Sequence, residues 1–174
     1  VNAPRQPDDL PSGWKIILGE DGYAYCVRVD KSNARALRVG SRAMDNVLRT
    51  EAAARQHLLR KPELEEVNDR IRAYAEHLHV RQPVWYRVAP IANGIEIDLC
   101  DEANTRVRIT PGTVEVVAQG SETTFRRTPV SRPMVMPANV GNLRLLAPYL
   151  NVHVSAVPLL VGWLSYVLAH PKVP

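Results

Sequence analysis

Acidic residues are missing from the C-terminal part of this chain of 174 residues: no Asp or Glu follows Glu122. The same part keeps its arginines and prolines, and then turns apolar over residues 157–169. A stretch that is basic, proline-rich and then apolar is typical of the approach to another domain, and not of the end of an enzyme. We therefore expect this chain to bind or couple, as one part of a larger protein, rather than to catalyse.

Short catalytic motifs are missing as well. The sequence contains no G-x-x-x-x-G-K-[ST] loop, no H-E-x-x-H, no paired C-x-x-C and no G-x-S-x-G. These patterns carry P-loop nucleotide binding, zinc hydrolysis, zinc knuckles and serine nucleophiles, respectively. No catalytic residue and no cofactor is therefore predicted for this chain.

Cysteine is scarce. Cys26 and Cys100 lie far apart, each in an apolar, strand-like run, which is typical of buried thiols in a cytosolic protein and not of a disulfide framework. The N-terminus lacks the apolar run of a signal peptide, and residues 157–169 are too few to cross a bilayer. We expect a soluble, cytoplasmic protein without membrane contact.

The length fits one domain, or one domain with an appended helical element, and an apolar content of 45% is enough for a sizeable core. Residues 1–13, with three prolines and Gly13, are expected to form a flexible leader. Residues 14–136 are expected to form an α+β domain. Residues 137–174 are expected to form a helical segment that leads toward an ATPase domain.

Local patterns predict the elements of the α+β domain. Asp21-Gly22 predicts a hairpin turn between strands at 14–18 and 23–29, followed by a strand at 36–40. Ser41 is a predicted N-cap for a helix over 42–60, and Lys61-Pro62 separates it from a second amphipathic helix over 63–78. Two helices joined by so short a break are expected to form an antiparallel hairpin.

Alternating apolar residues then predict an antiparallel meander, with Pro111-Gly112 at one turn. Its strands are expected at 84–89, 94–100, 106–109 and 113–117, with 125–127 at its end. A short helix is expected over 142–150, and a last helix over 157–169 with Ser155 as its cap and Pro158 in its first turn. The prediction is an α+β fold: an antiparallel meander sheet with a helical hairpin on one face and a C-terminal helical element.

Glu96 and Asp98 are separated by one residue on a predicted strand, which places both carboxylates on one face. We expect this face to be the solvent-facing side of a half-buried sheet. The alternative is a two-metal site of a minimal primase or nucleotidyl transferase.

Arginine supplies most of the basic residues, and its planar guanidinium suits phosphate. Aromatic residues in the same region offer surfaces for stacking bases. The candidate nucleic-acid-binding residues are Arg126, Arg127, Arg132, Arg144, Trp85 and Tyr86.

The order of segments 84–89, 94–101, 108–110, 125–127, 143–151 and 159–164 resembles the region ahead of the P-loop in phage and mobile-element ATP-binding proteins. That family is similar to replicative helicases and primase-helicases. The resemblance implies that a Walker A loop follows after Pro174, and that the full-length protein uses ATP and Mg. It transfers no catalytic residue to this chain.

The leading hypothesis is an accessory N-terminal domain of a mobile-element DNA replication ATPase or helicase. It would engage DNA, or position and oligomerise the motor, with the ATPase domain of the same polypeptide as its partner. The first alternative is a protein-interaction or assembly module without nucleic-acid contact, which the apolar residues 157–169 favour. The metal-dependent primase is the second.

Overall fold

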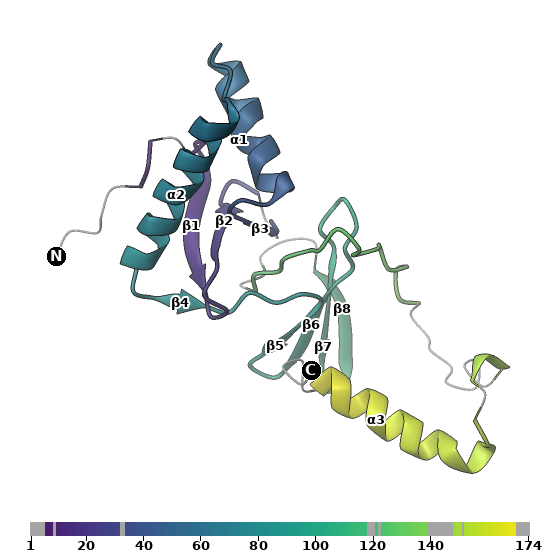
Figure 1. The fold of residues 1–174 in the computed structure, drawn as a ribbon. Helices are drawn as coiled ribbons and strands as arrows, with labels where there is room; N and C mark the ends of the chain where they lie inside the picture. The colour runs from purple at the N-terminus through teal and green to yellow at the C-terminus, as the bar shows by residue number, and fades with distance from the viewer. Residues whose placement is uncertain are drawn as a thin grey trace.

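Two four-stranded sheets follow one another along the chain (Figure 1). The computed structural model describes residues 6–8, 10–31, 34–117, 121, 123–138, 148–150 and 152–169. The strand order is β3-β2-β1-β4 in the first sheet and β5-β6-β7-β8 in the second. The predicted α+β class is confirmed, although the strands divide between two sheets.

The first sheet is built around the predicted hairpin. β1 (Trp14–Gly19) pairs antiparallel with β2 (Ala24–Arg28), and Gly22 adopts the positive φ of 81° that this turn requires. β3 (Ala36–Arg38) pairs with β2 as predicted. β4 (Arg81–Gln82) was not predicted, because a two-residue strand parallel to β1 has no alternation to reveal it.

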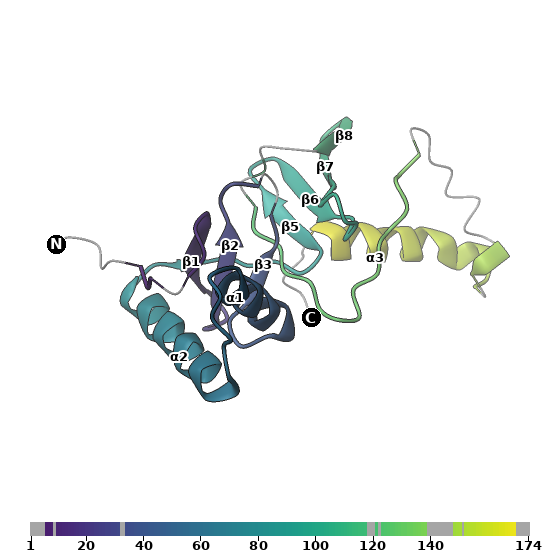
Figure 2. The same cartoon turned by 90° about the horizontal axis from the view of Figure 1, so that it is seen from above.

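Two helices cover one face of this sheet (Figure 2). α1 (Arg42–Ala54) is capped by the Ser41 hydroxyl, which accepts from the Met44 N–H at 3.3 Å. It ends before the predicted residue 60. α2 (Lys61–His77) carries Pro62 in its first turn, where the missing N–H is tolerated, and not in the break between the helices.

The core of this half lies between the helices and the sheet. It includes Leu10, from the segment that was predicted to be a flexible leader; Leu10 is buried. Cys26 is also buried, as is Cys100 in the second half, and both thiols are free. The buried members are Leu10, Ile16, Leu18, Ala24, Cys26, Val39, Met44, Leu48, Leu64, Val67, Ile71 and Ala75.

The second sheet is the predicted meander. β5 (Val88–Ile91), β6 (Gly94–Asp98), β7 (Arg106–Thr110) and β8 (Thr113–Val117) pair antiparallel in sequence order. The first strand begins at Val88, later than the predicted residue 84. The helical hairpin packs on the first sheet, and not on the meander as predicted.

Residues 124–126 link the two halves and do not end the meander. Ala36 N–H donates to the Phe125 carbonyl oxygen at 2.7 Å, and Arg126 N–H donates to the Trp85 carbonyl oxygen at 2.7 Å. The Phe125 side chain is buried at this junction. The segment therefore fixes β3 beside the residues that precede β5.

The C-terminal helical element follows a 3-10 turn, η2 (Val154–Ala156), and α3 (Val157–Ala169) contacts β6. The predicted cap, Ser155, lies inside η2, and the ring Nδ1 of His153 accepts from the Ser155 N–H at 3.4 Å. Most of the predicted helix 142–150 lies outside the described residues. None of the helices in the described ranges has both the length and the apolar character needed to cross a membrane.

Candidate nucleic-acid interface

The six predicted nucleic-acid-binding residues fall in different environments. Arg126 and Tyr86 contact each other at the junction of the two halves. Arg127 points toward β6, and Trp85 is half-buried. Arg132 is exposed on the segment after the junction, and Arg144 lies outside the described residues.

Arg126 is held by three side chains. Its Nη1 lies 3.0 Å from the Asp21 carboxylate, and its guanidinium donates hydrogen bonds to the hydroxyl oxygens of Tyr25 and Tyr86. Its guanidinium carbon also lies 4.0 Å from the centroid of the Tyr86 ring. Burial, and then the hydrogen bond to Asp21, raises the pKa of Tyr25, so this phenol stays neutral. The contacts fix the Tyr86 ring while 52% of the residue remains exposed.

Arg127 is committed to β6. Its Nη2 and Nε donate to the two carboxylate oxygens of Asp98 at 2.7 and 2.9 Å, and its Nη1 donates to the Asp101 carbonyl oxygen at 2.6 Å. The side chains of Arg127 and Asp98 are only 9% and 2% exposed. Burial alone would raise the pKa of Asp98. The hydrogen bonds from Arg127 and from the Cys100 N–H outweigh that effect and hold the pKa below the usual carboxyl value.

The expectation that Glu96 and Asp98 face solvent is wrong. Both are buried, because β7 places Arg108 opposite Glu96 and Arg106 opposite Asp98, and because Arg127 covers Asp98. Guanidinium nitrogens of Arg106 and Arg108 lie 3.5 and 3.6 Å from the Glu96 carboxylate oxygens. A divalent cation at this pair would have to displace arginines that already compensate the charge.

A cleft lies where the start of α1 meets the junction segment, and we call it the arginine cleft. Its volume is about 400 Å³. Five arginines line it, and none of the described lining residues is acidic. The lining arginines are Arg35, Arg38, Arg42, Arg126 and Arg127, and Tyr86 completes one wall.

The three arginines from the first half are exposed at the surface of this cleft. Arg35 directly precedes β3, Arg38 is the last residue of β3, and Arg42 is the first residue of α1. The guanidinium carbon of Arg38 lies 3.6 Å from the Tyr23 ring centroid, so this guanidinium group stacks on an aromatic face. Sequence reasoning missed these residues because they lie far from residue 126 in the chain. The only signal was their close spacing around the predicted cap at Ser41.

A second concavity, which we call the aromatic pocket, shares the walls of the arginine cleft. Tyr86 and Arg126 line both, and the aromatic pocket has a volume of about 380 Å³. Its other lining residues are Glu20, Asp21, Pro83, Val84 and Trp85. The two concavities therefore meet at Tyr86, with arginines on one side and aromatic and acidic groups on the other.

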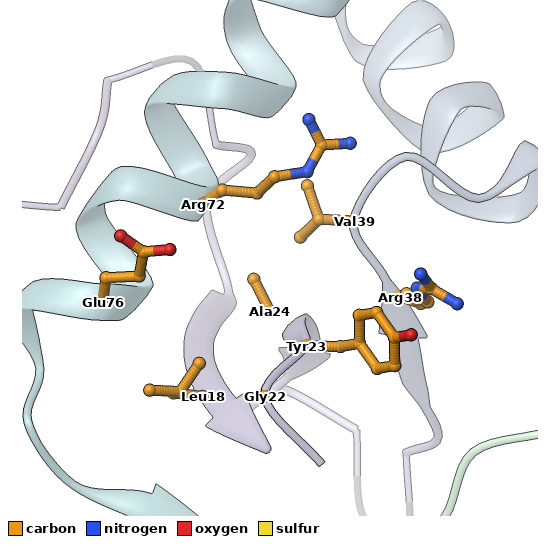
Figure 3. Close-up of a pocket in the computed structure, with 8 residues that line it drawn as sticks. All are labelled: Leu18, Gly22, Tyr23, Ala24, Arg38, Val39, Arg72 and Glu76. Carbon is orange, nitrogen blue, oxygen red and sulfur yellow. The ribbon is translucent and has the colours of Figure 1, made fainter. Parts of the chain in front are cut away.

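A further pocket of about 350 Å³ lies between α2 and the first sheet (Figure 3). Leu18, Ala24 and Val39 line its interior, while Arg72 and Glu76 reach over it from α2. Arg38 is common to this pocket and the arginine cleft. Its mixed charges make it a weaker candidate for an anion than the arginine cleft.

No family model, no curated protein and no solved structure matches the chain.

Proposed function

We propose that this chain is a non-catalytic module that binds the phosphate backbone of nucleic acid in the arginine cleft. The observation that carries the proposal is a concave surface lined by five arginines and, among its described lining residues, by no carboxylate. Arg55, directly after α1, and Arg70, in α2, have a different setting, because each pairs with a glutamate four residues earlier, Glu51 and Glu66.

The arginines of the cleft fall into two groups, one held by carboxylates and one exposed. Arg126 and Arg127 are bound to Asp21 and Asp98 and form a fixed wall. Arg35, Arg38 and Arg42 are exposed and offer guanidinium groups to a ligand. Guanidinium groups bind phosphate oxygens in pairs, and such contacts give affinity with little dependence on base sequence.

The N-terminus of α1 borders the cleft, because Ser41, Arg42 and Ala43 line it, and Asp45 in the same turn offsets part of the helix dipole. The first N–H groups of a helix and its dipole favour an anion. This contribution is secondary to the arginines, and it places the favourable potential at one end of the cleft.

We further propose that the parent protein is a DNA replication ATPase of a phage or mobile element, with this chain as its accessory DNA-engaging domain. The order of segments between residues 84 and 164 supports this context by its resemblance to such proteins. ATP and Mg would then be cofactors of the ATPase domain. In the parent protein, the double variant Arg35→Ala/Arg42→Ala should weaken stimulation of ATP hydrolysis by DNA and leave hydrolysis without DNA unchanged. Equal stimulation of both proteins would contradict this role.

Binding itself is tested by fluorescence anisotropy with a labelled oligonucleotide at low salt. Removing Arg35 and Arg42 should weaken binding by about 1 kcal/mol, or about fivefold, for each arginine. The matched control is Arg55→Ala/Arg70→Ala, which removes the same charge from exposed positions outside the cleft. Equal losses in both double variants would mean that net charge, and not the cleft, determines binding.

A second function, assembly, is favoured by α3. This helix has no charged residue, and Leu159, Trp163 and Tyr166 are 78, 59 and 52% exposed. A helix without a polar face is usually buried against other protein. We propose that α3 contributes to self-association or to contact with the ATPase domain, and sedimentation of the chain is the test.

A further inference from the structure

We propose that Tyr86 stacks an unpaired base in the aromatic pocket while the adjacent phosphate lies in the arginine cleft, so that the module prefers single-stranded nucleic acid. This inference rests on the proposed function, because it assigns the polymer that the arginine cleft takes. It goes further by adding a base site and by excluding duplex as the preferred ligand.

Tyr86 lies where the arginine cleft and the aromatic pocket meet. It is the aromatic residue that lines both concavities, and 52% of it is exposed. A phosphate in one concavity therefore has its own sugar and base beside the Tyr86 ring. Trp85, half-buried in the same pocket, adds a second aromatic surface.

Arg126 prepares the ring for stacking. It contacts both the hydroxyl and the ring of Tyr86, and Asp21 and Tyr25 hold Arg126 in turn. A ring that is already ordered loses little conformational freedom when a base binds. Arg126 is thus a positioning residue for Tyr86 and also a cationic wall of the arginine cleft.

Charge separates the two concavities. Glu20 and Asp21 line the aromatic pocket, whereas no acidic residue is found among the described residues of the arginine cleft. Carboxylates disfavour a second phosphate in the aromatic pocket and tolerate a neutral base. The distribution of charge therefore favours the phosphate in the arginine cleft and the base in the aromatic pocket.

Stacking on Tyr86 explains why a single strand should be preferred over a duplex. The faces of bases inside a duplex are covered by neighbouring base pairs, so an aromatic side chain can stack only on a base that is unpaired and unstacked. Phosphate contacts by arginine do not distinguish single strands from duplexes in this way. Preference for a single strand is therefore the signature of Tyr86, separate from the affinity that the arginines provide.

The experiment compares three labelled probes of about 12 nucleotides: oligo-dT, a duplex of the same length, and an abasic strand that keeps every phosphate. Wild type should bind oligo-dT about tenfold more tightly than the duplex or the abasic strand. Tyr86→Leu should lose that preference and still bind all three probes. Tyr86→Trp should retain the preference, which shows that the ring and not the hydroxyl is needed.

Tyr149→Leu is the matched control, since Tyr149 is 87% exposed and lines neither concavity. Equal binding of oligo-dT and the abasic strand by wild type would overturn the base site and leave phosphate binding intact. Failure of wild type to bind any probe at low salt would overturn both proposals. Circular dichroism of each variant confirms that the fold is retained.

Discussion

Arg127 and Asp98 form a buried, two-point ion pair that joins the junction segment to strand β6. The two nitrogen–oxygen distances are 2.7 and 2.9 Å, and the Asp98 side chain is 2% exposed. A pair with this geometry fixes the direction of the chain immediately after Arg126. It thereby sets the wall that the arginine cleft and the aromatic pocket share.

Removing Asp98 should destabilise the fold strongly, because Arg127 would remain buried without its counter-charge. Asp98→Ala is expected to lower the free energy of unfolding by about 3–5 kcal/mol. Asp69→Ala is the control, since it breaks an exposed pair with Arg72 that is worth at most about 1 kcal/mol. Chemical denaturation measures both, and equal small losses would show that the buried pair contributes no more than a surface pair.

The ion pair between Arg127 and Asp98 makes the free energy of unfolding depend on pH. The pKa of Asp98 is lower in the folded state than in the unfolded chain, where a carboxyl titrates near pH ~3.9. The stabilisation is therefore complete above that pH and is lost as the pH falls toward the lower folded-state value. Unfolding free energies of wild type and Asp98→Asn should converge in acid. A constant difference from neutral pH to below pH ~3 would contradict the shift.

Both cysteines should resist modification in the native protein. Burial raises the pKa of Cys26 to about 12, and burial and then the Asp98 charge raise the pKa of Cys100. Since the thiolate is the reactive form, labelling with a disulfide reagent near pH ~8 should be slow until denaturant is added. Rapid labelling of Cys26 in the folded protein would mean that the core of the first half opens readily.

Substitution on α3 should separate assembly from folding. Leu159→Glu places a charge where the side chain is 78% exposed, so the change in unfolding free energy should stay within about 0.5 kcal/mol. If α3 mediates self-association, sedimentation should show a shift from oligomer to monomer in this variant. A wild-type chain that is monomeric at all concentrations would leave α3 no role in self-association.

Local chemistry made much of the fold predictable. The turn at Asp21-Gly22, the cap at Ser41 and the turn at Pro111-Gly112 each depend on a few adjacent residues, and all three are found as predicted. The apolar stripe of α2 also faces the core as its periodicity indicated. Such local features can be predicted without knowing which distant segments pack together.

Long-range pairing was less predictable. Glu96 and Asp98 were predicted to face solvent, because the alternation of residues along a strand does not reveal that Arg106 and Arg127 lie against the same face. The division into two sheets likewise depends on the short β4 and on the Phe125 junction. Of the residues that line the two concavities, Arg126, Arg127, Tyr86 and Trp85 were predicted from sequence to bind nucleic acid, and that role stays a prediction. The three exposed arginines around Ser41 needed the three-dimensional arrangement.

The salt dependence of oligonucleotide binding decides whether the arginine cleft binds phosphate. Wild-type affinity should fall linearly with the logarithm of salt concentration. The Arg35→Ala/Arg42→Ala slope should be shallower by about 0.7 for each lost phosphate contact on a single strand. Arg55→Ala/Arg70→Ala should keep the wild-type slope. Binding that is undetectable at low salt, or that does not weaken as salt rises, would contradict a phosphate-binding function for this chain.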